Sequence, residues 1–211
     1  METLGKLFDS QARVKVMKLF LSNEDKTFDN EDLVKRTKTA LPTLKKELNL
    51  LEKAGFLKKK VFYKEIETKI PKTKKKPAGV KIVKKKTNGW GINEKFQYLS
   101  PLHSLLVDMT SFTSSSILKN LSGAGKLKLV LVSGAFIQNS ESRVDILVVG
   151  DNIQTSRVDR AVGILESEIG KELRYVVLRT DDFNYRLNIY DKLVRDILDT
   201  PHQKIVNRLG I

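Results

Sequence analysis

Apolar residues recur at helical spacing near the start of the chain, and this pattern predicts two short helices. The first runs from Ser10, whose hydroxyl can cap it, to about Leu21. The second starts at Asn30 or Asp29 and reaches Arg36, with acidic residues in its first turn, where the helix dipole favours them. Both helices have an apolar face that must pack against a further element.

The third predicted helix, LPTLKKELNLLEKAG, has two different faces. Pro42 suits its first turn, and Gly55 suits the position after its end. Apolar residues at spacing i, i+4 and i+7 form the first face: Leu44, Leu48 and Leu51. Polar residues form the other: Thr43, Lys45, Lys46 and Asn49. We expect the first face in a core and the second open to a partner.

The pattern then changes to the alternation that is typical of strands, in FLKKKVFYKEIE and again in VKIVKKK. Between them, KIPKTKKKPAG predicts a hairpin tip with four lysines: Lys72, Lys74, Lys75 and Lys76. Three helices followed by a β-hairpin have the order of a winged helix-turn-helix. We expect this domain over residues 1–93, so that the whole chain is an α+β protein of two domains.

Charge narrows the class of partner. The chain has 39 Lys and Arg against 25 Asp and Glu, and residues 1–100 alone carry 25 against 12, a net charge of +13. A basic half favours a polyanion, either nucleic acid or an anionic membrane surface. The lack of cysteine excludes disulfides and thiolate metal sites. Without a signal peptide or an apolar run long enough for a membrane span, we expect a cytoplasmic protein.

The polar face of the third helix favours double-stranded DNA. In a major groove, lysine can donate to guanine and asparagine can pair with adenine, while the four lysines of the hairpin tip suit phosphates. The stretch TLKKELNLLEKAGFL resembles the winged-helix regulators of the ArsR/MarR type, over residues 4–92.

Residues 94–123 predict a helical connector. We expect a homodimer with contacts over residues 98–122, because paired recognition helices can read a two-fold symmetric site.

The second half predicts an α/β domain over residues 124–211. Apolar runs at 127–134, 143–150 and 173–180 read as strands, with a helix at 155–170 between the last two. A long helix is expected from Asp181 to Leu198, with Phe183 and Tyr190 on one face, and then a tail helix at 201–209. This order favours a compact mixed sheet with helices on one face.

Residues 124–200 resemble the minimal nucleotidyltransferase domain of the polymerase-β superfamily. The resemblance implies a Gly-Ser turn for nucleotide phosphates and three carboxylates for two magnesium ions. Here Gly134 is kept, but Ala135 replaces the serine. Arg143 replaces the first aspartate, Asp145 survives, and Arg174 stands at the place of the third carboxylate. Such a site would repel Mg²⁺, so we expect no catalysis, no bound metal and no cofactor.

The altered pocket allows two interpretations, provided that Arg143, Asp145 and Arg174 converge. Asp145 can form a structural ion pair with an arginine, or the arginines can bind a small anionic effector with help from the amides of Gly134 and Ala135. For the whole chain we favour a sequence-specific DNA-binding regulator. The alternatives are an active nucleotidyltransferase similar to adenylylating antitoxins, which needs a second carboxylate such as Glu141, and a non-specific nucleic-acid-binding protein.

Overall fold

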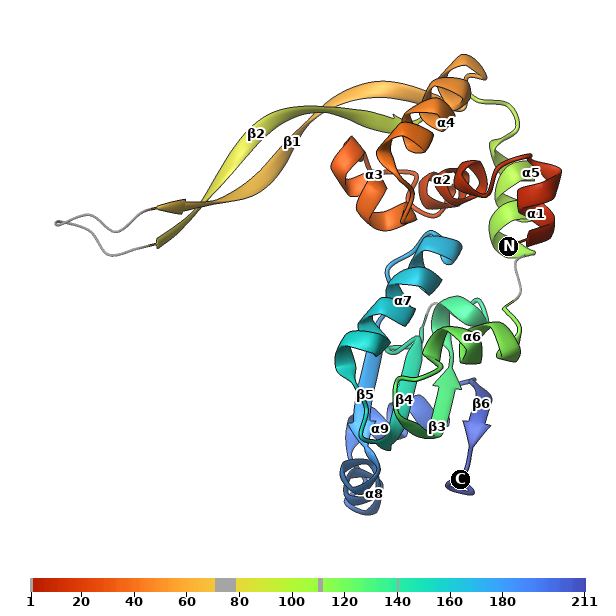
Figure 1. The fold of residues 1–211 in the computed structure, drawn as a ribbon, viewed down its shortest axis with the longest axis vertical. Helices are drawn as coiled ribbons and strands as arrows, with labels where there is room; N and C mark the ends of the chain where they lie inside the picture. The colour runs from red at the N-terminus through yellow and green to blue at the C-terminus, as the bar shows by residue number, and fades with distance from the viewer. Residues whose placement is uncertain (1, 71–78, 110–111, 140) are drawn as a thin grey trace.

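The protein is a mixed α/β structure with helices and two sheets (Figure 1). The computed structural model describes residues 2–70, 79–109, 112–139 and 141–211. An N-terminal region of helices and a two-stranded sheet lies at one end of the molecule, and a four-stranded sheet with its helices lies at the other. No helix within the described ranges is long and apolar enough to cross a membrane.

The three helices predicted for the N-terminal region are confirmed. Ser10 caps the first of them by accepting the Arg13 N–H at 3.1 Å, and Asp29 caps the second by accepting the Asp32 N–H at 2.8 Å. Gly55, with a φ of +79°, follows the end of the third, as a C-terminal glycine should. A short helix precedes them, so the order is α1 (Glu2–Leu7), α2 (Gln11–Leu21), α3 (Asn30–Thr37) and α4 (Leu41–Lys53).

The hairpin is longer than the alternation predicted. Strands β1 (Leu57–Ile70) and β2 (Gly79–Ile92) pair antiparallel without a break, and the ribbon projects far from the helices (Figure 1). The segment at Gly89 belongs to the ladder and also contacts the chain before α3. A Cβ at Gly89 would lie 2.6 Å from the Phe28 carbonyl oxygen, so glycine is the residue that lets the two backbones approach.

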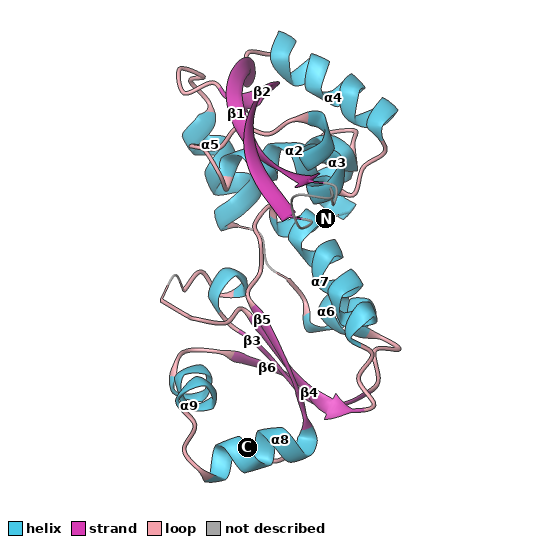
Figure 2. Ribbon diagram, turned by 90° about the vertical axis from the view of Figure 1, so that its left-hand side faces the viewer, coloured by secondary structure: helices cyan, strands magenta, loops and turns pink. Residues whose placement is uncertain are grey.

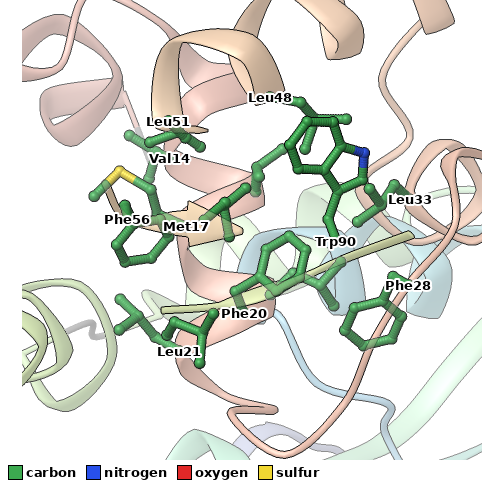
Figure 3. Close-up of a cluster of buried hydrophobic side chains, with 14 of the residues drawn as sticks. Val14, Met17, Phe20, Leu21, Phe28, Leu33, Leu48, Leu51, Phe56 and Trp90 are labelled. Atoms are coloured by element: carbon green, nitrogen blue, oxygen red, sulfur yellow. The ribbon is translucent and has the colours of Figure 1, made fainter. Parts of the chain in front are cut away.

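The N-terminal core forms where α2, α3, α4 and the base of the ribbon meet (Figure 3). Phe20 packs edge to face on Phe28, with 5.5 Å between ring centroids. Trp90 lies among these side chains, and its backbone pairs with that of Phe28. Trp90 thus fixes the base of the ribbon to the helices.

The predicted connector divides between the two cores. Helix α5 (Leu99–His103) continues into a π-helical turn (Ser104–Asp108), from which Leu106 packs into the N-terminal core. Helix α6 (Ser114–Leu121) packs on the four-stranded sheet through Ile117 and Leu121.

The larger sheet has the strand order β5-β4-β3-β6. Its strands β3 and β4 are antiparallel, as are β3 and β6, whereas β4 and β5 are parallel, so the predicted mixed sheet is confirmed. The sheet comprises β3 (Lys126–Val132), β4 (Ile146–Asp151), β5 (Tyr175–Arg179) and β6 (Gln203–Asn207). The predicted tail helix is wrong, because residues 203–207 pair as an edge strand with β3.

Helices cover both faces of this sheet, which corrects the expectation of one covered face (Figure 2). The strand side chains alternate: Val130 and Val148 pack with α6 and α7 (Thr155–Ile169), while Leu131 and Leu147 pack on the opposite side. The opposite side is covered by α8 (Thr180–Asn188) and α9 (Lys192–Asp199). Strands that are buried on both faces read as continuous apolar runs, so the apolar runs of β3 and β4 were themselves the signal for a second layer of helices.

The single long helix predicted from Asp181 to Leu198 is wrong. Asp191 accepts the N–H groups of Leu193 and Val194 at 3.1 and 3.2 Å and thereby starts a new helix. Tyr190, expected on the apolar face, has a φ of +55° in the turn and is exposed. A local cap ended the helix although the apolar spacing continued across it.

The two regions meet at the end of α7. The buried side-chain amide of Asn23 donates to the carbonyl oxygens of Leu19 and Gly170, each at 2.8 Å. Arg36 of α3 contacts Glu172 at 2.6 Å. Gly170 has a φ of +86°, and a Cβ there would lie 2.6 Å from the Lys18 backbone. The α/β region is therefore held against α2 and α3, on the side away from α4 (Figures 1 and 2).

Candidate nucleic-acid interface

Helix α4 presents the two faces that its sequence predicts. Leu44, Leu48 and Leu51 are buried in the N-terminal core. All four polar residues of the other face are exposed: Thr43, Lys45, Lys46 and Asn49. The helix lies at the end of the molecule opposite the α/β region, so that region leaves this face uncovered (Figure 1).

A buried ion pair holds α4 on α2. Glu47 lies on the inner face of α4 and is almost fully buried. Arg13 donates to its carboxylate through Nε at 2.8 Å and to the Phe8 carbonyl through Nη1 at 2.7 Å. The sequence analysis missed this pair, although its signal was present: Glu47 is a lone carboxylate three residues after Leu44, on the apolar face. The pair fixes the orientation of α4, and so of its open face, relative to α2.

The base of the ribbon is anchored to α3. Lys64 Nζ contacts Asp29 Oδ2 and Asp32 Oδ1, both at 2.8 Å, and Trp90 Nε1 donates to Asn30 Oδ1 at 3.3 Å. Burial lowers the pKa of Lys64, but the two carboxylates outweigh it, so the pKa lies above its ordinary value. Lys64 is thus neutralised within the protein, unlike the lysines of α4. The four predicted tip lysines, Lys72, Lys74, Lys75 and Lys76, lie outside the described residues.

In the α/β region, Asp145 and Arg174 come together as expected. Asp145, just before β4, is 3% exposed. Its Oδ1 accepts the Ala135 N–H at 2.9 Å, and its Oδ2 accepts the backbone N–H of Arg174 at 2.8 Å and the side-chain Nε at 3.2 Å. Gly134, with a φ of +53°, allows the carboxylate to sit against the turn. Both carboxylate oxygens of Asp145 therefore accept hydrogen bonds from within the chain. The Ala135 N–H, which was expected to help bind an anion, donates to Asp145 instead.

Arg143 does not join this group, which corrects the expected convergence. Its Nη1 contacts Asp196 Oδ2 of α9 at 3.2 Å instead. Strand β4 begins only at Ile146, so Arg143 lies in the irregular segment before it. The alternation of a regular strand, which would place residues 143 and 145 on one side, does not extend to this segment.

An open cleft of about 750 Å³ lies between the two regions, beside the Asp145 group. Cationic and anionic side chains both line it, including Lys26, Lys171 and Asp108. Among the residues that the structure describes, there is no group of three or more metal-ligating side chains placed to hold an ion. Asp145 is thus a lone carboxylate paired with an arginine, an arrangement that favours the ion pair over an anion site at these atoms.

The predicted site residues form two separate groups. The α4 face is open and uncovered, whereas the Asp145 group is internally satisfied. A scan against protein-family models, a search of curated proteins and a search of solved structures each found no match to this chain.

Proposed function

We propose that the protein is a sequence-specific regulator of transcription that binds double-stranded DNA through α4. The observation that carries the proposal is the open face of α4, where Thr43, Lys45, Lys46 and Asn49 are exposed opposite a buried leucine face. Lysine can donate to guanine O6 and N7, and asparagine can pair with adenine N6 and N7. A helix with this face, held rigidly by its partner helices, suits a major groove.

The proposal treats the N-terminal region as a winged helix, with α3 and α4 as the helix-turn-helix and the ribbon as the wing. Residues 1–93 form this domain, 94–123 the connector and 124–211 a second domain. The separate hydrophobic cores support two domains, with Leu106 of the connector in the N-terminal core and Ile117 and Leu121 in a core of the second region. The regulator acts as a cytoplasmic homodimer with contacts over residues 98–122, so that two α4 helices reach half-sites about one helical turn apart.

We assign the second domain a role without catalysis, in dimerisation or in sensing a small anionic effector. Two-metal nucleotidyl transfer needs carboxylates free to hold both ions. Among the described residues, no group of three or more metal-ligating side chains includes Asp145, and its oxygens already accept hydrogen bonds from Ala135 and Arg174. Label transfer from ATP with Mg²⁺ or Mn²⁺ that is lost in Asp145→Ala would overturn this assignment.

The direct test is recovery of sheared genomic DNA by the purified full-length protein near physiological salt, followed by sequencing. We expect enrichment of a two-fold symmetric site, which the doubly substituted Lys46→Ala, Asn49→Ala protein no longer enriches. Lys192→Ala, which removes an exposed lysine of α9, serves as the control and should leave the enrichment intact. Uniform recovery of all fragments would show only non-specific binding, and recovery of none would remove DNA as the partner.

A further inference from the structure

A small pocket lies between α3 and the end of α7, where the two regions of the protein meet (Figures 1 and 2). Helix α3 and the turn after it form one wall, and α7 and the turn after it form the other. The volume is about 150 Å³, and a cavity of this size holds a group of about six non-hydrogen atoms. The pocket is therefore large enough for one small chemical group.

The carboxylates in the wall of this pocket are already engaged within the protein. Each has a donor: Lys64 Nζ for Asp32 at 2.8 Å, Arg36 Nη2 for Glu172 at 2.6 Å and the Leu173 N–H for Glu166 at 2.9 Å. Three lysines of the wall are not engaged. Within the described part of the chain, no ion pair or hydrogen bond involves the side chains of Lys35, Lys38 and Lys171. The pocket is thus left with unpaired positive charge.

These three lysines are not needed as donors to the helix ends beside them. Lysine often donates to the last carbonyl groups of a helix. Here the Thr37 carbonyl at the end of α3 accepts from Lys15 Nζ at 3.3 Å, and the Gly170 carbonyl after α7 accepts from the side-chain amide of Asn23 at 2.8 Å. The lysines of the pocket are therefore available to a ligand.

Gly163 leaves the α7 wall of the pocket open. It lies in the interior of α7, where glycine destabilises a helix relative to alanine. Close contact between backbones does not require it, because a Cβ there would meet only the end of the Lys38 side chain among the described residues of other segments, at 3.3 Å from Cε. At Gly170, in contrast, a Cβ would lie 2.6 Å from the Lys18 backbone. Gly163 therefore provides space beside a cation.

We propose that this pocket binds a phosphate group, either free phosphate or the phosphate of a small phosphorylated metabolite, through Lys35, Lys38 and Lys171. A phosphate group brings about two negative charges near pH 7 and several strong acceptor oxygens, which suit lysines that come from different segments. A DNA duplex is too wide to enter a pocket that α7 closes on one side, so the phosphate comes from a small molecule.

The site also suggests how an effector reaches the DNA-binding helix, and this consequence rests on the proposed function. Lys38 lies in the turn between α3 and α4, whereas Lys171 follows α7 in the α/β region. A phosphate bound by both ties the turn before α4 to the second region. We expect it to change the affinity of α4 for DNA, and DNA to change the affinity for phosphate by the same factor.

The test titrates the full-length protein with inorganic phosphate and, separately, with glycerol 3-phosphate, by calorimetry at an ionic strength held constant with chloride. Lys35→Gln, Lys38→Gln removes two cations of the pocket, and Lys126→Gln, Lys192→Gln removes two exposed cations elsewhere as a matched control. We expect the pocket variant to bind about 10- to 100-fold more weakly, because two charge-assisted hydrogen bonds are lost, and the control to bind normally. Tighter binding of glycerol 3-phosphate identifies a phosphorylated metabolite, and otherwise free phosphate is the ligand.

Gly163→Leu fills the pocket without removing a charge. We expect it to abolish binding of both probes while stability in chloride does not fall, because leucine favours a helix more than glycine does. The site is wrong if the unsubstituted protein binds neither probe, or if the pocket variant and the control bind alike. It is also wrong if the pocket lysines affect only DNA binding, since they would then serve the DNA backbone.

A final titration with DNA, with and without inorganic phosphate at matched ionic strength, tests the link to α4. An altered DNA affinity that Gly163→Leu no longer shows supports effector sensing. An unchanged affinity would remove that role and leave the phosphate site in place. If the protein binds phosphate and no DNA, the proposed function fails while the site stands.

Discussion

The two regions of the protein place their charged side chains in opposite ways. On α4, Lys45 and Lys46 are exposed beside the polar side chains of Thr43 and Asn49. In the α/β region, the arginines that replace expected carboxylates are paired, Arg174 with Asp145 and Arg143 with Asp196. Exposed cations can attract a polyanion, whereas paired ones are already neutralised. The pairing of a charge, more than the number of charges, therefore decides which region can attract a polyanion.

The largest effect is expected when the internal pair of the α/β region is broken. Asp145→Ala leaves the N–H groups of Ala135 and Arg174 without their acceptor, and we expect a loss of about 3 kcal/mol in the free energy of unfolding. Arg174 itself is 56% exposed, so its side chain can regain water and adds little to the loss. Urea denaturation measures the change.

Asp199→Ala is the matched control for this prediction. Its contact with Arg195, at 3.7 Å, lies on the surface of the same region, so its removal should change stability by less than about 1 kcal/mol. Equal losses in the two variants would show that Asp145 is no more than a surface carboxylate. The contrast between the two regions would then disappear.

A smaller effect, on binding, is expected from the open face of α4. Lys46→Ala or Asn49→Ala should each weaken binding to the enriched DNA site by about 1–3 kcal/mol while leaving stability unchanged, because both side chains are exposed. Titration of the specific site and of an unrelated duplex measures the difference. Equal losses on both duplexes would mean that these residues contact phosphates only, and a loss of stability would mean that the face is structural.

The contact between the regions can be tested at Gly170. Gly170→Ala adds a Cβ against the Lys18 backbone at a φ of +86°, and we expect a loss of about 2 kcal/mol. Gly210→Ala provides the control, since it has a similar φ of +75° and nothing within 4 Å of its added Cβ. Thermal unfolding of both variants separates the backbone strain from the clash. If both lose the same stability, the packing at Gly170 contributes nothing.

The sequence predicted most of the elements and the open face of α4, because both depend on local spacing and caps. Leu44, Leu48 and Leu51 determine which side of that helix is buried, whatever surrounds it. The errors came from contacts between distant segments. The edge strand at 203–207 forms only because β3 offers it a partner, and Arg143 pairs with Asp196, 53 residues later in the chain. Neither partner is visible in the local pattern.

The smallest expected effect concerns Lys18, a buried lysine of α2 near the end of α7. Burial lowers its pKa from 10.5 to about 8, although Glu168 of α7 acts in the opposite direction. The unfolded chain therefore binds more protons than the folded protein between these two values, so this group makes stability rise with pH from about 8 to 10.5. The slope it adds is at most about 1.4 kcal/mol per pH unit.

Lys18→Met keeps the aliphatic length of the side chain and removes the titration. We expect the substituted protein to be more stable at pH 7 and to lose this rise, as measured by urea denaturation of both proteins at several pH values between 7 and 10. Parallel pH profiles would show that Lys18 keeps an ordinary pKa in the folded state. Lys18 would then be as well solvated as the exposed lysines of α4, although the structure buries its side chain.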